Sequence, residues 1–135
     1  AIIQFLSSGK ERIALPAALV CDHLVQANVG AIPDLKVAEK GNVETYEFLR
    51  DVSRRYGFDF WPAGSGICHQ VFMENYNFPG CMMLVTDSHT PTACGMGMLA
   101  IGVGGADLVD ALMGMEWELK MPKIIGVKLT GQLQG

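Results

Sequence analysis

Residues 81–91 read CMMLVTDSHTP, and this stretch decides the fold class. Its first half, Cys81–Val85, is a short apolar run of the length and composition of a buried strand. The run stops abruptly at polar, titratable residues. Because ligands of open α/β sheets bind outside the carboxyl ends of the strands, the pattern predicts a strand that delivers Asp87, Ser88 and His89 to a site.

A second apolar run shows the same pattern near the start of the chain. Residues Ile13–Cys21 are rich in Ala, Leu and Val and are interrupted only by Pro16. They predict a buried strand, which ends at Asp22 and His23. Two strands of one sheet would bring both polar groups to the same cleft.

The rest of the chain alternates between helical and strand patterns. Val43–Tyr56 has apolar residues at three- and four-residue intervals and is followed by Gly57, which predicts an amphipathic surface helix. The other expected elements are a helix over 2–6 ending near Gly9, a strand over Phe58–Trp61, a helix over Ile67–Glu74 with His69 in its first turn, a helix over Ala106–Met113, and a strand over Ile124–Leu129. This alternation predicts an α/β fold with a parallel or mixed sheet.

Composition predicts one domain that packs against more protein. Half of the 135 residues are hydrophobic and only 18% are charged. We therefore expect residues 1–135 to be part of a larger protein, cut at both ends. The net charge of −4 and the lack of a Lys/Arg stripe argue against a nucleic-acid partner. No apolar stretch approaches the roughly 20 residues needed to cross a membrane, so no membrane association is expected.

The four cysteines show no C-x-x-C pair. Cys21, Cys68, Cys81 and Cys94 are widely spaced in apolar contexts, which favours buried free thiols over disulfides. Because H-x-x-x-H spacing is absent as well, no metal ligands are assigned, although a His-plus-Asp zinc site stays formally possible.

All three histidines follow turn or strand-end signals, and two lie within two residues of an aspartate. A carboxylate beside an imidazole fixes its tautomer and favours its protonated form, so Asp22, His23, His69, Asp87 and His89 are candidates for acid–base chemistry. Each has a structural alternative. The first pair could cap a turn, His69 could bond a neighbour at a helix start, and residues 87–90 could form an Asx or Ser/Thr turn.

Other catalytic motifs are incomplete. The turns at Gly64–Gly66 and Gly102–Gly105 complete neither the dinucleotide-binding nor the P-loop pattern and are better explained as tight turns or close backbone approaches. Ser88 lacks the G-x-S-x-G context of a hydrolase nucleophile.

Taken together, several strings resemble mitochondrial-type aconitase, in that family's order and over nearly the whole chain. They are Cys21–Leu24, Gly64–Gln70, Glu74–Tyr76 with Pro79–Gly80, Thr86–Pro91, Gly102–Asp107 and Trp117–Lys120. The resemblance implies part of the family's N-terminal domain, a three-layer α/β sheet with helices on both faces. It implies a hydro-lyase that interconverts citrate and isocitrate through cis-aconitate with a [4Fe-4S] cluster, in the mitochondrial matrix, or in the cytoplasm if the source is bacterial.

The same resemblance assigns roles to the candidate residues. Asp22 with His23, and Asp87 with His89, match active-site Asp–His pairs, while His69 matches a histidine whose carboxylate partner lies beyond this chain. Ser88 matches a residue that contacts a substrate carboxylate, so Asp87, Ser88 and His89 are also the expected tricarboxylate-binding segment. In the family, substrate ligates one iron of the cluster, whose Lewis acidity helps hydroxide leave.

The resemblance also sets limits. None of the four cysteines matches a cluster ligand, and the serine base lies in a distant domain, so the isolated segment is expected to be inactive. The family usually has Asn where this chain has Thr92. Alternatives within the architecture are homoaconitase and isopropylmalate isomerase, and the alternative of another class is an RNA-binding relative that lacks the cluster.

Overall fold

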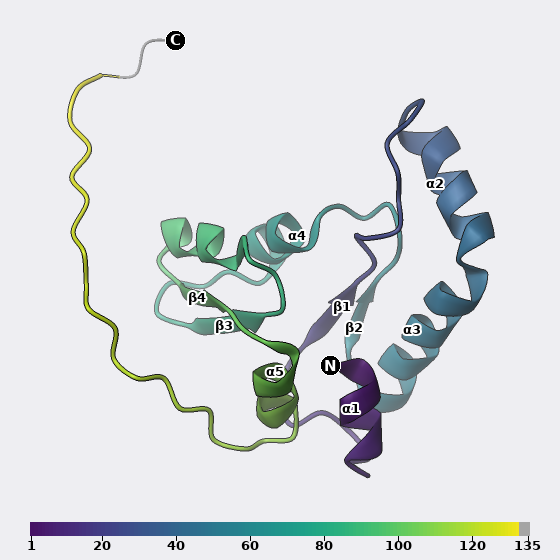
Figure 1. The fold of residues 1–135 in the computed structure, drawn as a ribbon, viewed down its shortest axis with the longest axis horizontal. Helices are drawn as coiled ribbons and strands as arrows, with labels where there is room; N and C mark the ends of the chain where they lie inside the picture. The colour runs from purple at the N-terminus through teal and green to yellow at the C-terminus, as the bar shows by residue number, and fades with distance from the viewer. Residues whose placement is uncertain (133–135) are drawn as a thin grey trace.

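The computed structural model of the chain describes residues 1–132; residues 133–135, the end of the predicted 1–135 domain, lie outside the described part. Figure 1 shows the elements in their spatial arrangement. In chain order they are α1 (Ile2–Ser7), β1 (Ala18–Val20), α2 (Ala31–Gly41), α3 (Val43–Tyr56), β2 (Asp59–Trp61), α4 (Cys68–Asn75), β3 (Met82–Val85), the 3₁₀ helix η1 (Thr90–Met96), β4 (Leu99–Gly102) and α5 (Gly105–Leu112).

The strands form two parallel pairs. β1 pairs with β2 in the register Ala18 to Asp59, and β3 pairs with β4 in the register Met82 to Leu99. The mixed α/β class is therefore confirmed. Among the described residues the two pairs are separate two-stranded sheets, so the three-layer arrangement predicted from the sequence is not seen within them.

The first predicted strand is shorter than expected. β1 covers only Ala18–Val20 of the predicted Ile13–Cys21. The backbone N–H groups of Ile13 and Ala14 donate instead to carbonyl groups at the ends of α3 and α5, and Pro16 has no N–H to give to a sheet. β1 ends at Val20, and Asp22 follows two residues later, close to the predicted strand end.

One hydrophobic core joins the chain's first helix to its last. Phe5 of α1 is fully buried and meets the rings of Tyr56 and Phe58 edge-on, with centroids 5.5 and 6.2 Å away. Val109 and Leu112 of α5 complete this core. The first and last described helices, α1 and α5, are thus packed together, and β1 and β2 lie beside them.

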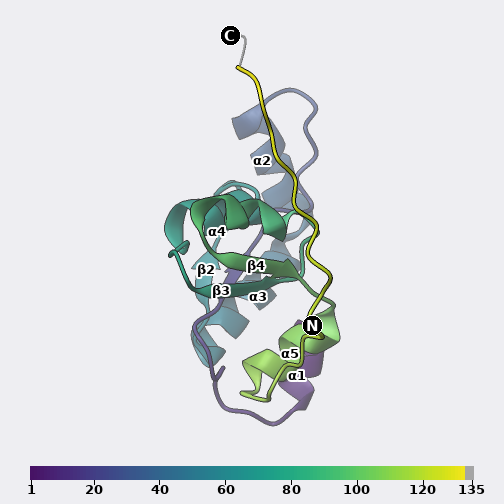
Figure 2. The same ribbon diagram turned by 90° about the vertical axis from the view of Figure 1, so that its left-hand side faces the viewer.

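A second core lies under α4 and η1. Met83 of β3 and Ala100 of β4 pack with Ala93 and Met98, and Figure 2 shows α4 on one side of this strand pair. The other side is less covered, since Met82 is 54% exposed. Cys81 is exposed as well and precedes the strand, so the expectation of a buried strand over Cys81–Val85 is wrong for both residues.

The helix predictions are largely confirmed. α3 has the predicted bounds and ends at Gly57, whose φ of 91° is left-handed. α4 and α5 begin within one residue of their predicted positions. α2 and β4 were not predicted. None of the described helices is long and apolar enough to cross a membrane.

The predicted strand over Ile124–Leu129 is absent from the described structure. Residues after α5 run as an extended segment without regular structure, away from the body of the molecule in Figure 1. Ile124, Val127 and Leu129 are exposed, the last at 92%. An extended segment needs a neighbouring strand to form a ladder, and no described strand lies beside this one.

Candidate active site

Asp22 connects the end of β1 to the start of α4. Its Oδ2 accepts a hydrogen bond from the backbone N–H of Cys68 at 2.8 Å, and its Oδ1 lies 2.7 Å from Nδ1 of His23. Burial alone would raise the pKa of Asp22, but the Cys68 N–H, the Cys68 thiol and His23 together hold it below its usual value. Asp22 is therefore a carboxylate fixed at the helix start.

Asp87 organises the loop that follows β3. Its Oδ2 accepts the backbone N–H of His89 at 2.8 Å, and its backbone carbonyl accepts the Thr90 hydroxyl at 2.6 Å. The Asx turn considered as an alternative is thus present. It also fixes the Asp87 carboxylate near the start of α4, so the turn and a functional role are compatible.

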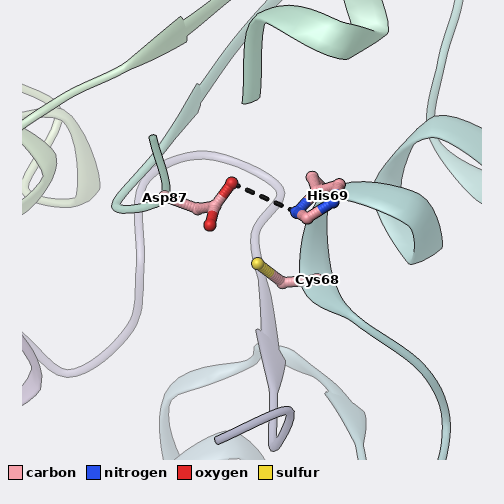
Figure 3. A group of neighbouring side chains, drawn as sticks. All are labelled: Cys68, His69 and Asp87. Carbon is pink, nitrogen blue, oxygen red and sulfur yellow. Dashed lines mark ion pairs between the residues drawn. The ribbon is translucent and has the colours of Figure 1, made fainter. Parts of the chain in front are cut away.

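His69 and Asp87 are brought together from different elements. Nδ1 of His69 lies 3.3 Å from Oδ2 of Asp87, and both side chains are more than four-fifths buried. Figure 3 shows the two groups facing each other across the space between α4 and the loop. The distance suits an ion pair, but the geometry does not make a hydrogen bond, and this Nδ1 atom is buried without a partner. The resemblance assigned His69 a carboxylate outside the chain; within the described residues, Asp87 is its neighbour.

His89 lies beside the same pair. Its ring centroid is 5.0 Å from that of His69, and its Nδ1 is 3.7 Å from Oδ1 of Asp87. Its side chain is largely exposed. Two imidazoles from α4 and the β3 loop therefore flank one carboxylate, an arrangement suited to exchanging protons with a bound molecule.

His23 differs from the other histidines. It contacts Asp22, but its side chain is 87% exposed. The next residue, Leu24, has a φ of 71°, and it is the one non-glycine residue with positive φ in the described chain. The end of β1, the start of α4 and the loop after β3 bring Asp22, His69, Asp87 and His89 together. His23 lies at the edge of this group.

An open cleft of about 770 Å³ adjoins the β3 loop. Its lining includes Thr86, Asp87 and Ser88 of the loop, and Leu119 and Pro122 of the extended segment. The Ser88 hydroxyl lies 3.5 Å from Nδ1 of His89. The two neighbouring imidazoles, those of His69 and His89, are not among the cleft's lining residues.

Cys68 is a member of this group that sequence reasoning did not assign to the site. It is buried at the first position of α4, and its thiol lies close to Asp22. Burial and the charges of Asp22 and Asp87 raise the pKa of the Cys68 thiol to about 12. Its position next to His69 was the available signal.

The four thiols are free, as predicted. Cys21 and Cys68 are buried, but Cys81 and Cys94 are exposed, so the expectation of burial is wrong for the latter two. Cys81 precedes β3, and Cys94 lies in η1. Burial raises the pKa of the Cys21 thiol, with a contribution from the Asp22 charge.

These features define an α/β segment with a carboxylate–imidazole site at strand ends. The Aconitase family (aconitate hydratase) model matches residues 8–135, and the chain belongs to that family. It is 56% identical to "Aconitate hydratase, mitochondrial" of Saccharomyces cerevisiae over 135 residues, which is all of this chain and 17% of that protein. It is 54% identical to the protein of the same name from Gracilaria gracilis over 134 residues, 99% of this chain and 17% of that protein.

A third relative agrees with these two. The chain is 55% identical to "Probable aconitate hydratase, mitochondrial" of Dictyostelium discoideum over 135 residues. That match spans the whole chain and 18% of the relative. The chain therefore corresponds to less than one fifth of the length of these relatives.

The described residues do not provide the ligands of an iron–sulfur cluster, the group this family generally carries. Such clusters are held by several cysteine thiolates. Here the one group of His, Cys, Asp and Glu donor atoms close enough to share an ion, within the described chain, is Cys68, His69 and Asp87, with a single sulfur.

Proposed function

We propose that this chain is part of an aconitate hydratase, a lyase that interconverts citrate and isocitrate through cis-aconitate. The observation that carries the proposal is the meeting of Asp22, His69, Asp87 and His89, from three segments distant in sequence, at the start of α4. The names of the relatives support the same activity and a mitochondrial location. In the matrix the protein would take part in the tricarboxylic acid cycle.

Removal and addition of water require a group that gives a proton to the departing hydroxyl and recovers it. Imidazole is the side chain best suited to this near neutral pH. We assign that role to His69 and His89, with Asp87 orienting both rings. His69 is 16% exposed, so bulk water has little access to it, whereas His89 faces the open side.

Asp22 and His23 complete the proposed catalytic set. The Asp22 carboxylate fixes the first turn of α4 by accepting the Cys68 N–H, and thereby sets the position of His69. His23 is exposed here, so its proposed role as an electrostatic partner of substrate requires substrate or other parts of the longer protein to cover it.

Substrate recognition is proposed for the loop after β3. Asp87, Ser88 and His89 form a turn whose hydroxyl and imidazole groups face an open cleft or solvent. A tricarboxylate offers several anionic oxygens to such donors. Thr92, where the family usually has Asn, donates its hydroxyl to the carbonyl of His89 at 2.6 Å and could tune this loop.

The remaining parts are proposed to lie outside this chain. A [4Fe-4S] cluster would supply Lewis acidity, with ligands from other regions of the longer protein, because the described cysteines do not form a ligand set. The two strand pairs would belong to one three-layer α/β sheet, completed by other strands. The exposed apolar residues of the extended segment are consistent with packing against the remaining domains.

The test is a substrate comparison with the full-length, cluster-loaded protein. Citrate and isocitrate should be converted with a higher kcat/KM than homocitrate or isopropylmalate. A preference for either of the latter would assign the protein to homoaconitase or isopropylmalate isomerase. Salt-sensitive RNA binding in a filter assay, without hydratase activity on any of these acids, would overturn the enzyme proposal.

A further inference from the structure

The 3₁₀ helix η1 continues the loop after β3. It begins at Thr90, directly after His89, and runs for 7 residues to Met96. Runs of 3₁₀ helix longer than about three or four residues are uncommon, because their hydrogen bonds are poorly aligned. The position of η1 should therefore depend on its contacts with other segments of the chain.

The first turn of η1 is bonded to His89 itself. The carbonyl oxygen of His89 accepts the backbone N–H of Thr92 at 3.0 Å and the Thr92 hydroxyl at 2.6 Å. Thr90 and Ala93, one 3₁₀ turn apart, are both almost fully buried. Because Thr92 lies between these two buried residues, a displacement of Ala93 would move Thr92 and, through its two bonds, the backbone of His89.

The turn that follows α4 contacts η1 at two places. Asn77 lies two residues beyond the end of α4, and its Nδ2 donates a hydrogen bond to the carbonyl of Ala93 at 2.8 Å. Further along the turn, the backbone N–H of Gly80 donates to the carbonyl of Gly97 at 2.8 Å. Within the described chain, Asn77 is the residue of turn 77–80 whose side chain hydrogen-bonds to η1.

The same stretch of chain contains a comparable amide with a different partner. Nδ2 of Asn75 donates to the carbonyl of Val71, also at 2.8 Å, but this bond stays within α4. The Asn77 bond instead joins residues 16 positions apart in sequence. A carbonyl oxygen only accepts hydrogen bonds, so each amide must present its Nδ2 group. The two asparagines thus make the same kind of bond, and only Asn77 connects α4 to η1.

We propose that Asn77 is a positioning residue for His89. Its amide holds η1 at Ala93, and the bonds of Thr92 pass that placement to His89. Asn77 bonds to the backbone of η1 and not to the imidazole, so it acts on the chemistry indirectly. The effect on turnover rests on the proposed function, whereas the placement of η1 does not.

The placement is tested by amide hydrogen exchange of the full-length, cluster-loaded protein, measured by mass spectrometry. Asn77→Leu removes the donor at similar side-chain volume, and exchange in a peptide covering residues 87–97 should become about fivefold faster or more. Asn75→Leu, the matched control, should leave exchange in this peptide within about twofold of wild type. Equal exchange in the two variants would overturn the proposal.

The effect on His89 is tested by kcat at saturating citrate and equal cluster content. Asn77→Leu should lower kcat by about tenfold, less than the loss of the imidazole itself, because the ring is displaced and not removed. In a His89→Ala background the same substitution should change kcat by less than about twofold. A merely structural role would lower kcat by the same factor in both backgrounds, and that result would remove Asn77 as a positioning residue for His89.

Two results have their own criteria. If His89→Ala retains wild-type turnover, the proposed role of His89 fails, and hydrogen exchange alone decides whether Asn77 holds η1. If Asn77→Leu does not fold, Asn77→Ser takes its place, because the serine hydroxyl is too short to reach the carbonyl of Ala93. Unchanged exchange in that variant would overturn the proposal in the same way.

Discussion

The backbone carbonyl oxygen of Asp87 lies 2.6 Å from the point where a Cβ atom on Gly102 would stand. Gly102 is the last residue of β4, and Asp87 begins the proposed substrate loop two residues after β3 ends. A Cβ atom does not approach a backbone carbonyl oxygen this closely, so the residue at position 102 sets how near the loop can lie to the strand pair.

Gly102→Ala should therefore displace the Asp87 loop. A shift of about 1 Å in a catalytic group can cost about 100-fold in rate, so we expect kcat for citrate to fall by one to two orders of magnitude. Gly41→Ala is the matched control, because a Cβ at that position meets nothing within 4 Å. Turnover of Gly102→Ala equal to that of the control would show that the loop position does not matter.

Asp34 fixes the loop between β1 and α2. Its carboxylate accepts the backbone N–H groups of Asn28, Val29 and Gly30 at 2.7 to 3.2 Å, and these bonds lower the pKa of Asp34. Asp34→Ala should remove all of these acceptors. We expect faster amide hydrogen exchange, measured by mass spectrometry, in a peptide covering residues 24–34 of the full-length protein; unchanged exchange would contradict the assignment.

The same bonds predict a pH dependence. Because the folded-state pKa of Asp34 is lowered, its ionised form stabilises the loop fully above the unfolded value of about 3.9, and the stabilisation is lost as pH falls through the folded value. After correction for intrinsic exchange rates, wild-type exchange in this peptide should rise toward that of Asp34→Ala only below pH of about 4. A rise near neutral pH would indicate another titrating group.

Tyr76 links the end of α4 to β2. Its hydroxyl accepts the indole N–H of Trp61 at 2.7 Å and donates to Oδ2 of Asp59 at 3.1 Å. Tyr76→Phe should lower the free energy of local opening of α4 by about 1 kcal/mol, the usual net contribution of a hydrogen bond. Hydrogen exchange of residues 68–76 measures this change.

Tyr46→Phe provides the comparison for Tyr76, because its hydroxyl makes only a marginal contact, 3.5 Å from the carbonyl of His23. It should leave exchange in residues 68–76 unaltered. Equal effects of the two substitutions would mean that the Trp61–Tyr76–Asp59 bonds do not hold α4 in place.

Local patterns predicted those parts of the fold that depend on local forces. α3 was predicted to the residue, because a helical apolar repeat and a terminal glycine specify it without help from other segments. α2 was missed: Pro33 suggests a break, yet proline is tolerated in a first turn, and Asp34 satisfies the N–H groups before the helix. The strand expected over Ile124–Leu129 needs a partner that the pattern alone does not reveal.

The candidate site was predicted as a set of residues but not as a geometry. Strand-end signals correctly place Asp22 and Asp87 where apolar strands stop. The contact of His69 with Asp87, and the inclusion of Cys68, depend on how α4 packs across the two strand pairs, which no short-range pattern encodes.

The central claim is that the Asp87–His89 loop performs acid–base chemistry in citrate dehydration. The most direct measurement is kcat for citrate of full-length His89→Ala, compared with wild type at equal cluster content. A positioned acid–base group contributes about 100-fold or more, so kcat should fall by at least that factor. Turnover within about threefold of wild type would contradict the claim and remove His89 from the active site.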